Sequence, residues 1–135
     1  MEIHIKTIPA EHQRYPTVGD YWYDTEGVLQ VRITEMPESI SPELAEFYTK
    51  MIIVHELSEE ALTKFRGLTE PEIADFDKYY EMRREQGLVP EDSEPGFDNN
   101  APYLREHTLS TAIEMQMCAM AGLSWSDYDN LINEL

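Results

Sequence analysis

The chain has very little cysteine, few basic residues and no long apolar run. Cys118 is the only cysteine among 135 residues, which excludes an internal disulfide and a zinc site built from several thiolates. No stretch approaches the roughly 20 apolar residues that a membrane-spanning helix needs. Residues 1–12 also lack the basic and apolar regions of a signal peptide. We therefore expect a cytoplasmic protein in a reducing compartment.

Positive charge is the scarcest property of the chain. Lys and Arg number 10 against 27 Asp and Glu, for a net charge of −17. Such a chain repels the phosphates of nucleic acids and anionic lipids, so we expect no direct binding to nucleic acid or membrane. The sequence also has no glycine-rich phosphate loop and no G-x-S-x-G elbow. Most of the carboxylates serve solubility, but the surplus leaves some that can bind a cation.

Apolar residues are plentiful enough for one compact core. They make up 41% of the chain, with eight Tyr, four Phe and two Trp, which is typical of a globular protein. We predict a single α+β domain over residues 1–135. A short β region of antiparallel strands (residues 1–37) precedes three to four helices (residues 41–135), and the helical region includes an acidic loop at residues 87–102.

The β region is predicted from alternation and turn residues. The segment EIHIKTI alternates apolar and polar residues, which predicts a strand with Ile3, Ile5 and Ile8 on one side. The segments YWY and VLQVRI predict a hairpin, because residues 24–27 between them are turn formers.

The helical region is predicted from capping residues and from a change of period. Ser41 and Thr69 are N-cap residues, each followed by proline in the first turn, and Gly67 is a C-terminal stop. We predict helices over residues 42–66, 69–86, 102–121 and 126–135. The first helix has an apolar stripe with mostly three- and four-residue spacing, formed by Leu44, Phe47, Met51, Val54, Ala61 and Phe65.

The first helix also contains an H-E-x-x-E motif, formed by His55, Glu56 and Glu59. His55 and Glu59 lie in a second row at helical spacing, made of Tyr48, Ile52, His55, Glu59 and Leu62. Burial of an unpaired carboxylate costs several kcal/mol, so Glu59 needs a partner. A His and a Glu one turn apart can both bind a single zinc ion.

Two other helices carry polar residues where apolar ones are normal. One row of the third helix consists of Leu104, His107, Thr111, Glu114 and Cys118. On the second helix, Asp77 falls on the predicted buried side. A catalytic zinc usually has three protein ligands and a water, and His55, Glu59 and His107 are the predicted set. Asp77 or Glu114 is predicted as a fourth ligand or as a partner behind the ligands.

The motif resembles the metal-binding helix of the zincin class of metallopeptidases, in which a strand region precedes the helix and a later helix supplies the third ligand. The resemblance implies that His55 is the first ligand and that Glu56 is the general base. Glu59 stands where zincins have a second histidine, a change that adds negative charge and lowers the Lewis acidity of a bound ion. The chain is also similar to small phage and bacterial proteins of unassigned role that carry HEL-x-E and a later REH.

Three alternatives compete with a zinc site. In the simplest, His55 and His107 are hydrogen-bonded histidines at the edge of the core, and Glu59 lies on a solvated flank beside Glu60 and Lys64. In that case the motif has no functional meaning.

A second alternative is a magnesium site. Glu56-x-x-Glu59 with Glu72-x-x-Asp75 resembles the pattern of the all-α nucleoside triphosphate pyrophosphohydrolases, whose carboxylates bind Mg²⁺. Those enzymes are helical throughout, whereas this chain opens with strands. No basic cluster follows that could bind a triphosphate.

The third alternative is a non-enzymatic interaction protein, in which the acidic surface imitates nucleic acid toward a basic partner or serves assembly. An aromatic group could anchor a protein partner; it consists of Tyr15, Tyr21, Trp22 and Tyr23. Against these alternatives, we expect a divalent-metal-binding protein with a zincin-like helix. It is either a metal-dependent hydrolase that uses Glu56 as base or a degenerate, structural version of one.

Overall fold

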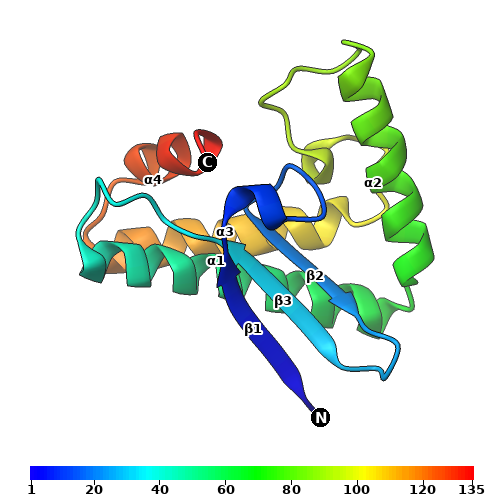
Figure 1. The fold of residues 1–135 in the computed structure, drawn as a ribbon, viewed down its shortest axis with the longest axis horizontal. Helices are drawn as coiled ribbons and strands as arrows, with labels where there is room; N and C mark the ends of the chain where they lie inside the picture. The colour runs from blue at the N-terminus through cyan, green and yellow to red at the C-terminus, as the bar shows by residue number, and fades with distance from the viewer.

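The structure is a computed structural model that describes all 135 residues (Figure 1). In chain order the elements are β1 (Ile3–Ile8), η1 (Ala10–His12), β2 (Gly19–Tyr23), β3 (Leu29–Thr34), α1 (Pro42–Arg66), α2 (Glu70–Glu85), η2 (Pro95–Phe97), α3 (Leu104–Ala121) and α4 (Trp125–Asn133). A three-stranded sheet followed by four helices confirms the predicted α+β class. None of the helices is long and apolar enough to cross a membrane.

The sheet is mixed and has the strand order β1-β3-β2. β2 and β3 form the predicted antiparallel hairpin, and the Asp24 carboxylate closes its turn by accepting the N–H groups of Glu26 and Val28. β1 pairs with β3 in parallel, so the expectation of antiparallel strands is wrong for β1. The reason is that the chain reverses twice between β1 and β3, and β3 then inserts between the first two strands.

One face of the sheet forms the core with α1. Val31 and Ile33 are fully buried on that face, as their alternation predicts. β1 runs without a bulge, so alternate residues face opposite sides. Ile8 therefore faces away from Ile3 and Ile5, and the prediction that all three share a side is wrong.

α1 begins and ends where its capping residues predict. The Ser41 hydroxyl accepts the N–H of Leu44 at 3.2 Å, and Gly67 ends the helix with a left-handed φ of 85°. The helix lies across the sheet and packs along α3 (Figure 1). The two helices are antiparallel, because contacts pair the end of α1 with the start of α3.

The buried side of α1 changes character halfway along the helix. Its first half buries apolar and aromatic side chains, Tyr48, Met51 and Ile52. Its second half buries polar ones, namely His55, Glu56, Glu59, Glu60 and Thr63. The predicted apolar stripe is therefore wrong at its C-terminal end, where Ala61 is exposed and Phe65 is 95% exposed. The helix extends past the apolar core there, and its inner side faces a polar cleft instead.

α2 stands on the far side of that cleft. Thr69 and Glu72 form the predicted capping box at its start. Of its predicted buried side chains, Tyr80 is fully buried, and Ile73 and Phe76 are half-buried. The acidic loop that follows contains one short helical turn, η2, which packs against α3.

The change along α1 can be tested by two truncations. Met51→Ala removes a fully buried side chain and is expected to lower the free energy of unfolding by about 2–5 kcal/mol. Phe65→Ala removes a larger side chain that is solvated, so the loss should stay within about 0.5 kcal/mol. Denaturant unfolding measures both values. Similar losses for the two variants would contradict the placement of the core.

Candidate metal centre

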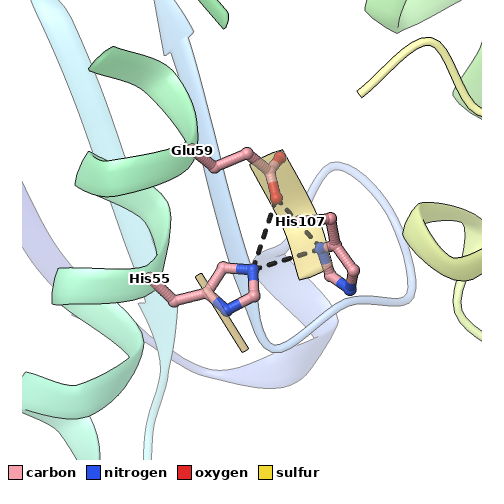
Figure 2. Close-up of side chains that lie close together, drawn as sticks. All are labelled: His55, Glu59 and His107. Carbon is pink, nitrogen blue, oxygen red and sulfur yellow. Dashed lines mark hydrogen bonds and ion pairs between the residues drawn. The ribbon is translucent and has the colours of Figure 1, made fainter. Parts of the chain in front are cut away.

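Three side chains from two helices converge on one point (Figure 2). His55 and Glu59 project from neighbouring turns of α1, and His107 reaches the same point from α3. His55 Nε2 lies 3.2 Å from His107 Nδ1 and 3.3 Å from Glu59 Oε2. His107 Nδ1 lies 2.9 Å from the same carboxylate oxygen. All three residues are buried.

The triangle of ligating atoms matches one face of a zinc tetrahedron. With zinc–nitrogen bonds of about 2.0–2.1 Å, the ligand atoms around a tetrahedral ion lie about 3.3 Å apart. The three distances of 3.2, 3.3 and 2.9 Å are close to that value. The group could therefore hold one metal ion after small side-chain movements.

Each imidazole uses its second nitrogen to bond a further carboxylate. His55 Nδ1 is hydrogen-bonded to Glu114 on α3, which also accepts the hydroxyl of Tyr128 on α4. His107 Nε2 lies 3.0 Å from Glu94 of the acidic loop. Such carboxylates fix the tautomer and orientation of ligating histidines. They leave one nitrogen of each ring directed at the common point.

Burial and hydrogen bonds within the cluster shift the pKa values of its ionisable side chains. Burial alone would lower the pKa of His55, but hydrogen bonds to Glu114 and Glu59 raise it to about 11. Burial likewise opposes the charge of His107, whose bonds to Glu59 and Glu94 raise the pKa to about 9. Burial raises the pKa of a carboxyl, yet hydrogen bonds from the two imidazoles lower the pKa of Glu59 below its ordinary value. These raised pKa values favour the imidazolium form of each ring near neutral pH.

Glu56 lies next to the cluster and has no partner of its own. Its side chain is only 9% exposed and its carboxylate makes no hydrogen bond, so burial raises the pKa of this carboxyl. Gly19 on β2 makes room for it: a Cβ at Gly19 would lie 2.3 Å from Glu56 Oε1. The carboxylate is thus held between α1 and the edge strand, free to interact with whatever occupies the cleft.

A second glycine makes room for His107. A Cβ at Gly96 would lie 2.4 Å from Cγ of the His107 ring. The neighbouring Phe97 packs edge-on against the same ring, with centroids 4.5 Å apart. The acidic loop is therefore fitted to His107 by packing as well as by the Glu94 hydrogen bond.

The cluster opens into a cleft of about 620 Å³. One wall comes from β2 and α1, and the other from α2 and the acidic loop. Carboxylates far outnumber basic side chains in the lining, and the basic ones have partners, as in the 2.7 Å contact between Arg14 and Asp20. The cleft therefore attracts cations.

The structure gives the five sequence-predicted ligands three different positions. His55, Glu59 and His107 come together as predicted. Glu114 bonds the far nitrogen of His55, which is the orienting role, one of the two predicted for it. Asp77 is hydrogen-bonded to Tyr103 and is not part of the converging group.

The structure also bears on the three alternatives to a zinc site. Glu60 is buried and accepts the hydroxyl of Tyr23, so this flank of α1 is less solvated than its sequence suggests. The four carboxylates of the magnesium pattern do not form a group: Glu72 caps α2 and Asp75 is exposed. Among the aromatic anchors, Tyr21 and Tyr23 pack against the core.

The sequence predicts Tyr128 only as a core residue, and the structure confirms that position. Its hydrogen bond to Glu114, the contact of Glu94 with His107 and the space at both glycines were not predicted. Glu94 lies in a loop without periodicity, where one carboxylate looks like any other. In sequence Gly96 follows a proline and looks like an ordinary turn glycine; the space that it leaves for His107 is visible only in the structure. Comparison of the chain with models of protein families, with curated proteins and with solved structures gave no match.

The shifted imidazoles predict how the metal-free protein responds to pH. Folded His55 and His107 retain protons that the unfolded chain releases near pH 6.5. Their contribution is complete below that pH and is lost as the pH rises through about 9 for His107 and about 11 for His55. In chelator, the free energy of unfolding should fall between pH 6.5 and 9, by up to about 1.4 kcal/mol per pH unit for each retained proton.

Denaturant unfolding at a series of pH values measures this dependence. His107→Gln should reduce the slope, whereas His12→Gln, at an exposed position, should leave it unchanged. A stability that is flat or rises over this range would contradict the described protonation.

The fit of the acidic loop predicts the effect of Gly96→Ala. The added methyl overlaps the His107 ring, so the loop or the ring must move and the bond to Glu94 is lost. We expect a loss of about 1–3 kcal/mol in stability. Gly87→Asn is the matched control, since Gly87 is in open space and Asn tolerates its positive φ of 72°. Equal effects of both variants would contradict the packing argument.

Proposed function

We propose that the chain binds one zinc ion through His55, Glu59 and His107 and acts as a metal-dependent hydrolase with Glu56 as general base. The observation that carries the proposal is the convergence of one atom from each ligand within 3.3 Å, with both imidazoles oriented by a further carboxylate. Three protein ligands leave a fourth tetrahedral position open, as in catalytic zinc sites.

The electrostatics of the cluster favour a divalent cation. In the metal-free state two imidazolium charges offset two of the three carboxylate charges of Glu59, Glu94 and Glu114. A divalent ion that displaces the two imidazolium protons leaves the total charge unchanged. A monovalent ion that displaced both protons would leave the cluster one unit more negative, which is costly in a largely buried site.

Glu56 is placed for proton transfer. Zinc in such a site lowers the pKa of water and polarises a substrate carbonyl. Glu56 follows His55 on α1, so its side chain is turned about 100° round the helix axis. It therefore lies away from the point where the three ligands converge but lines the same cleft. Its unpaired carboxylate and its pKa, raised by burial, suit a general base that works near neutral pH. In this role the Glu56 carboxylate would take a proton from water and give it to the leaving group.

A structural or degenerate zinc site is the second form of the proposal. Glu59 in place of a neutral ligand adds negative charge to the ion and lowers its Lewis acidity. The hydrogen bonds that tie the cluster to α4 and to the acidic loop suit a stabilising ion. In this form zinc raises stability, and Glu56 has no catalytic role.

The metal content of the purified protein tests whether it binds zinc, and a variant at Glu56 tests whether the site catalyses hydrolysis. Protein purified without a histidine tag should contain one zinc per chain, and binding should release close to two protons. His55→Ala and His107→Ala should each lower zinc affinity by at least about 100-fold. Glu56→Gln should retain zinc and abolish hydrolysis of a panel of ester and peptide substrates.

The matched control is Glu46→Gln, which removes an exposed carboxylate from the same helix. Retained zinc without any Glu56-dependent hydrolysis would favour the structural form. Absence of zinc, together with unchanged stability in chelator, would refute both forms.

A further inference from the structure

β1 is an edge strand with nothing covering its outer side (Figure 1). Its residues are exposed along the strand, except for Ile8, which is half-buried. Ile3 and Ile5 lie on the face that α1 covers elsewhere, yet they are 38% and 42% exposed. An open edge with apolar side chains is a pairing site for another strand.

The hydrogen bonds between β1 and β3 show which backbone groups of β1 remain free. The Glu35 N–H donates to the Ile8 carbonyl at 2.9 Å. In a parallel pair this geometry turns Ile8 and every second residue before it toward β3. Ile3, Ile5 and Thr7 therefore direct their N–H and C=O groups at the open edge.

Of the usual devices that prevent edge pairing, β1 carries only a charged side chain, that of Lys6. No proline or bulge interrupts β1, and Pro9 comes only after its last residue. Lys6 is the one lysine or arginine of the strand. Glu2, whose carboxylate lies 2.8 Å from Nε2 of His4, precedes the strand on the same face. The charges of Glu2 and Lys6 have opposite signs and are four residues apart.

We propose that β1 pairs with β1 of a second copy of the chain, antiparallel and about a two-fold axis at His4. In this register Ile3 lies opposite Ile5 of the second copy in a hydrogen-bonded pair, because both direct their backbone groups outward. Glu2 lies opposite Lys6 of the second copy, and the symmetry repeats both pairs. The contact is thus self-complementary in shape and in charge.

The neighbouring registers lack this complementarity. Because only alternate residues of β1 direct their backbone groups at the open edge, the register can shift only in steps of two residues. One step in one direction places His4 opposite Lys6, and the next step places Lys6 opposite its own copy. One step in the other direction leaves Lys6 without an opposing residue on the strand. The charges therefore select the two-fold at His4.

The paired copies form one continuous six-stranded sheet. β2 is the edge farthest from β1, so both acidic clefts stay at the outer ends of that sheet and remain open. The interface does not involve the metal centre and does not depend on the proposed function.

Exchanging the two charges tests the register. Sedimentation equilibrium of the wild-type chain should show a concentration-dependent dimer. Glu2→Lys and Lys6→Glu each turn two attractive pairs into repulsive ones and should raise the dissociation constant about tenfold, or about 1.4 kcal/mol. The double variant restores opposite charges and should recover wild-type affinity. Lys50→Glu, at an exposed position on α1, is the control for net charge.

A single cysteine provides a second test. His4→Cys faces its own copy at a non-hydrogen-bonded site, where Cα atoms are about 4.5 Å apart, and should form a disulfide-linked dimer under mild oxidation. Lys6→Cys places its Cα about 14 Å from the Cα of the same residue in the second copy, which is too far for a disulfide, and should not cross-link. Native Cys118 is buried and does not interfere. A monomer at every concentration, a double variant that fails to recover, or equal cross-linking of both cysteine variants would overturn the proposal.

Discussion

Burial of opposite charges between α1 and α3 is the constraint on which the rest of the structure depends. Carboxylates and imidazoles occupy positions where two antiparallel helices normally bury apolar side chains. Each of these groups would cost several kcal/mol if it lost its partner. The cluster is stable because every imidazole nitrogen faces an acceptor or the common point. Protons or a cation must neutralise the cluster, and its stability therefore depends on solution conditions.

The surrounding elements complete this cluster rather than add to the apolar core. α4 contributes the Tyr128 hydroxyl, and the acidic loop contributes Glu94 together with the space at Gly96. β2 contributes the space at Gly19, which lets Glu56 lie against the strand. The apolar core occupies the other half of α1. The molecule is thus divided along one helix into a half that stabilises the fold and a half that presents ionisable groups to a cleft.

Much of this arrangement could be predicted from local sequence patterns. Capping at Ser41 and Gly67 and alternation at Val31 and Ile33 depend on neighbouring residues alone, and the structure confirms them. Helical spacing also predicts that His55 and Glu59 share a side of α1. The prediction that His107 joins them is confirmed, but it depends on how α3 packs against α1, which spacing alone does not fix. The parallel pairing of β1 was not predictable, since it depends on where β3 inserts.

The remaining errors have a tertiary origin. Phe65 has the right spacing for the apolar stripe, but α1 extends past the core before reaching it. Glu94 belongs to a loop whose path is set by packing against His107, and no local pattern reports that path. Periodicity identifies the side of a helix, but only the fold determines what that side meets.

X-ray absorption at the zinc edge of the zinc-loaded chain tests the central claim most directly. The account predicts four nitrogen and oxygen atoms at about 2.0–2.1 Å, with the outer-shell scattering of two imidazole rings. A shell made only of oxygen atoms, without imidazole scattering, would mean that the ion binds surface carboxylates and would contradict the account.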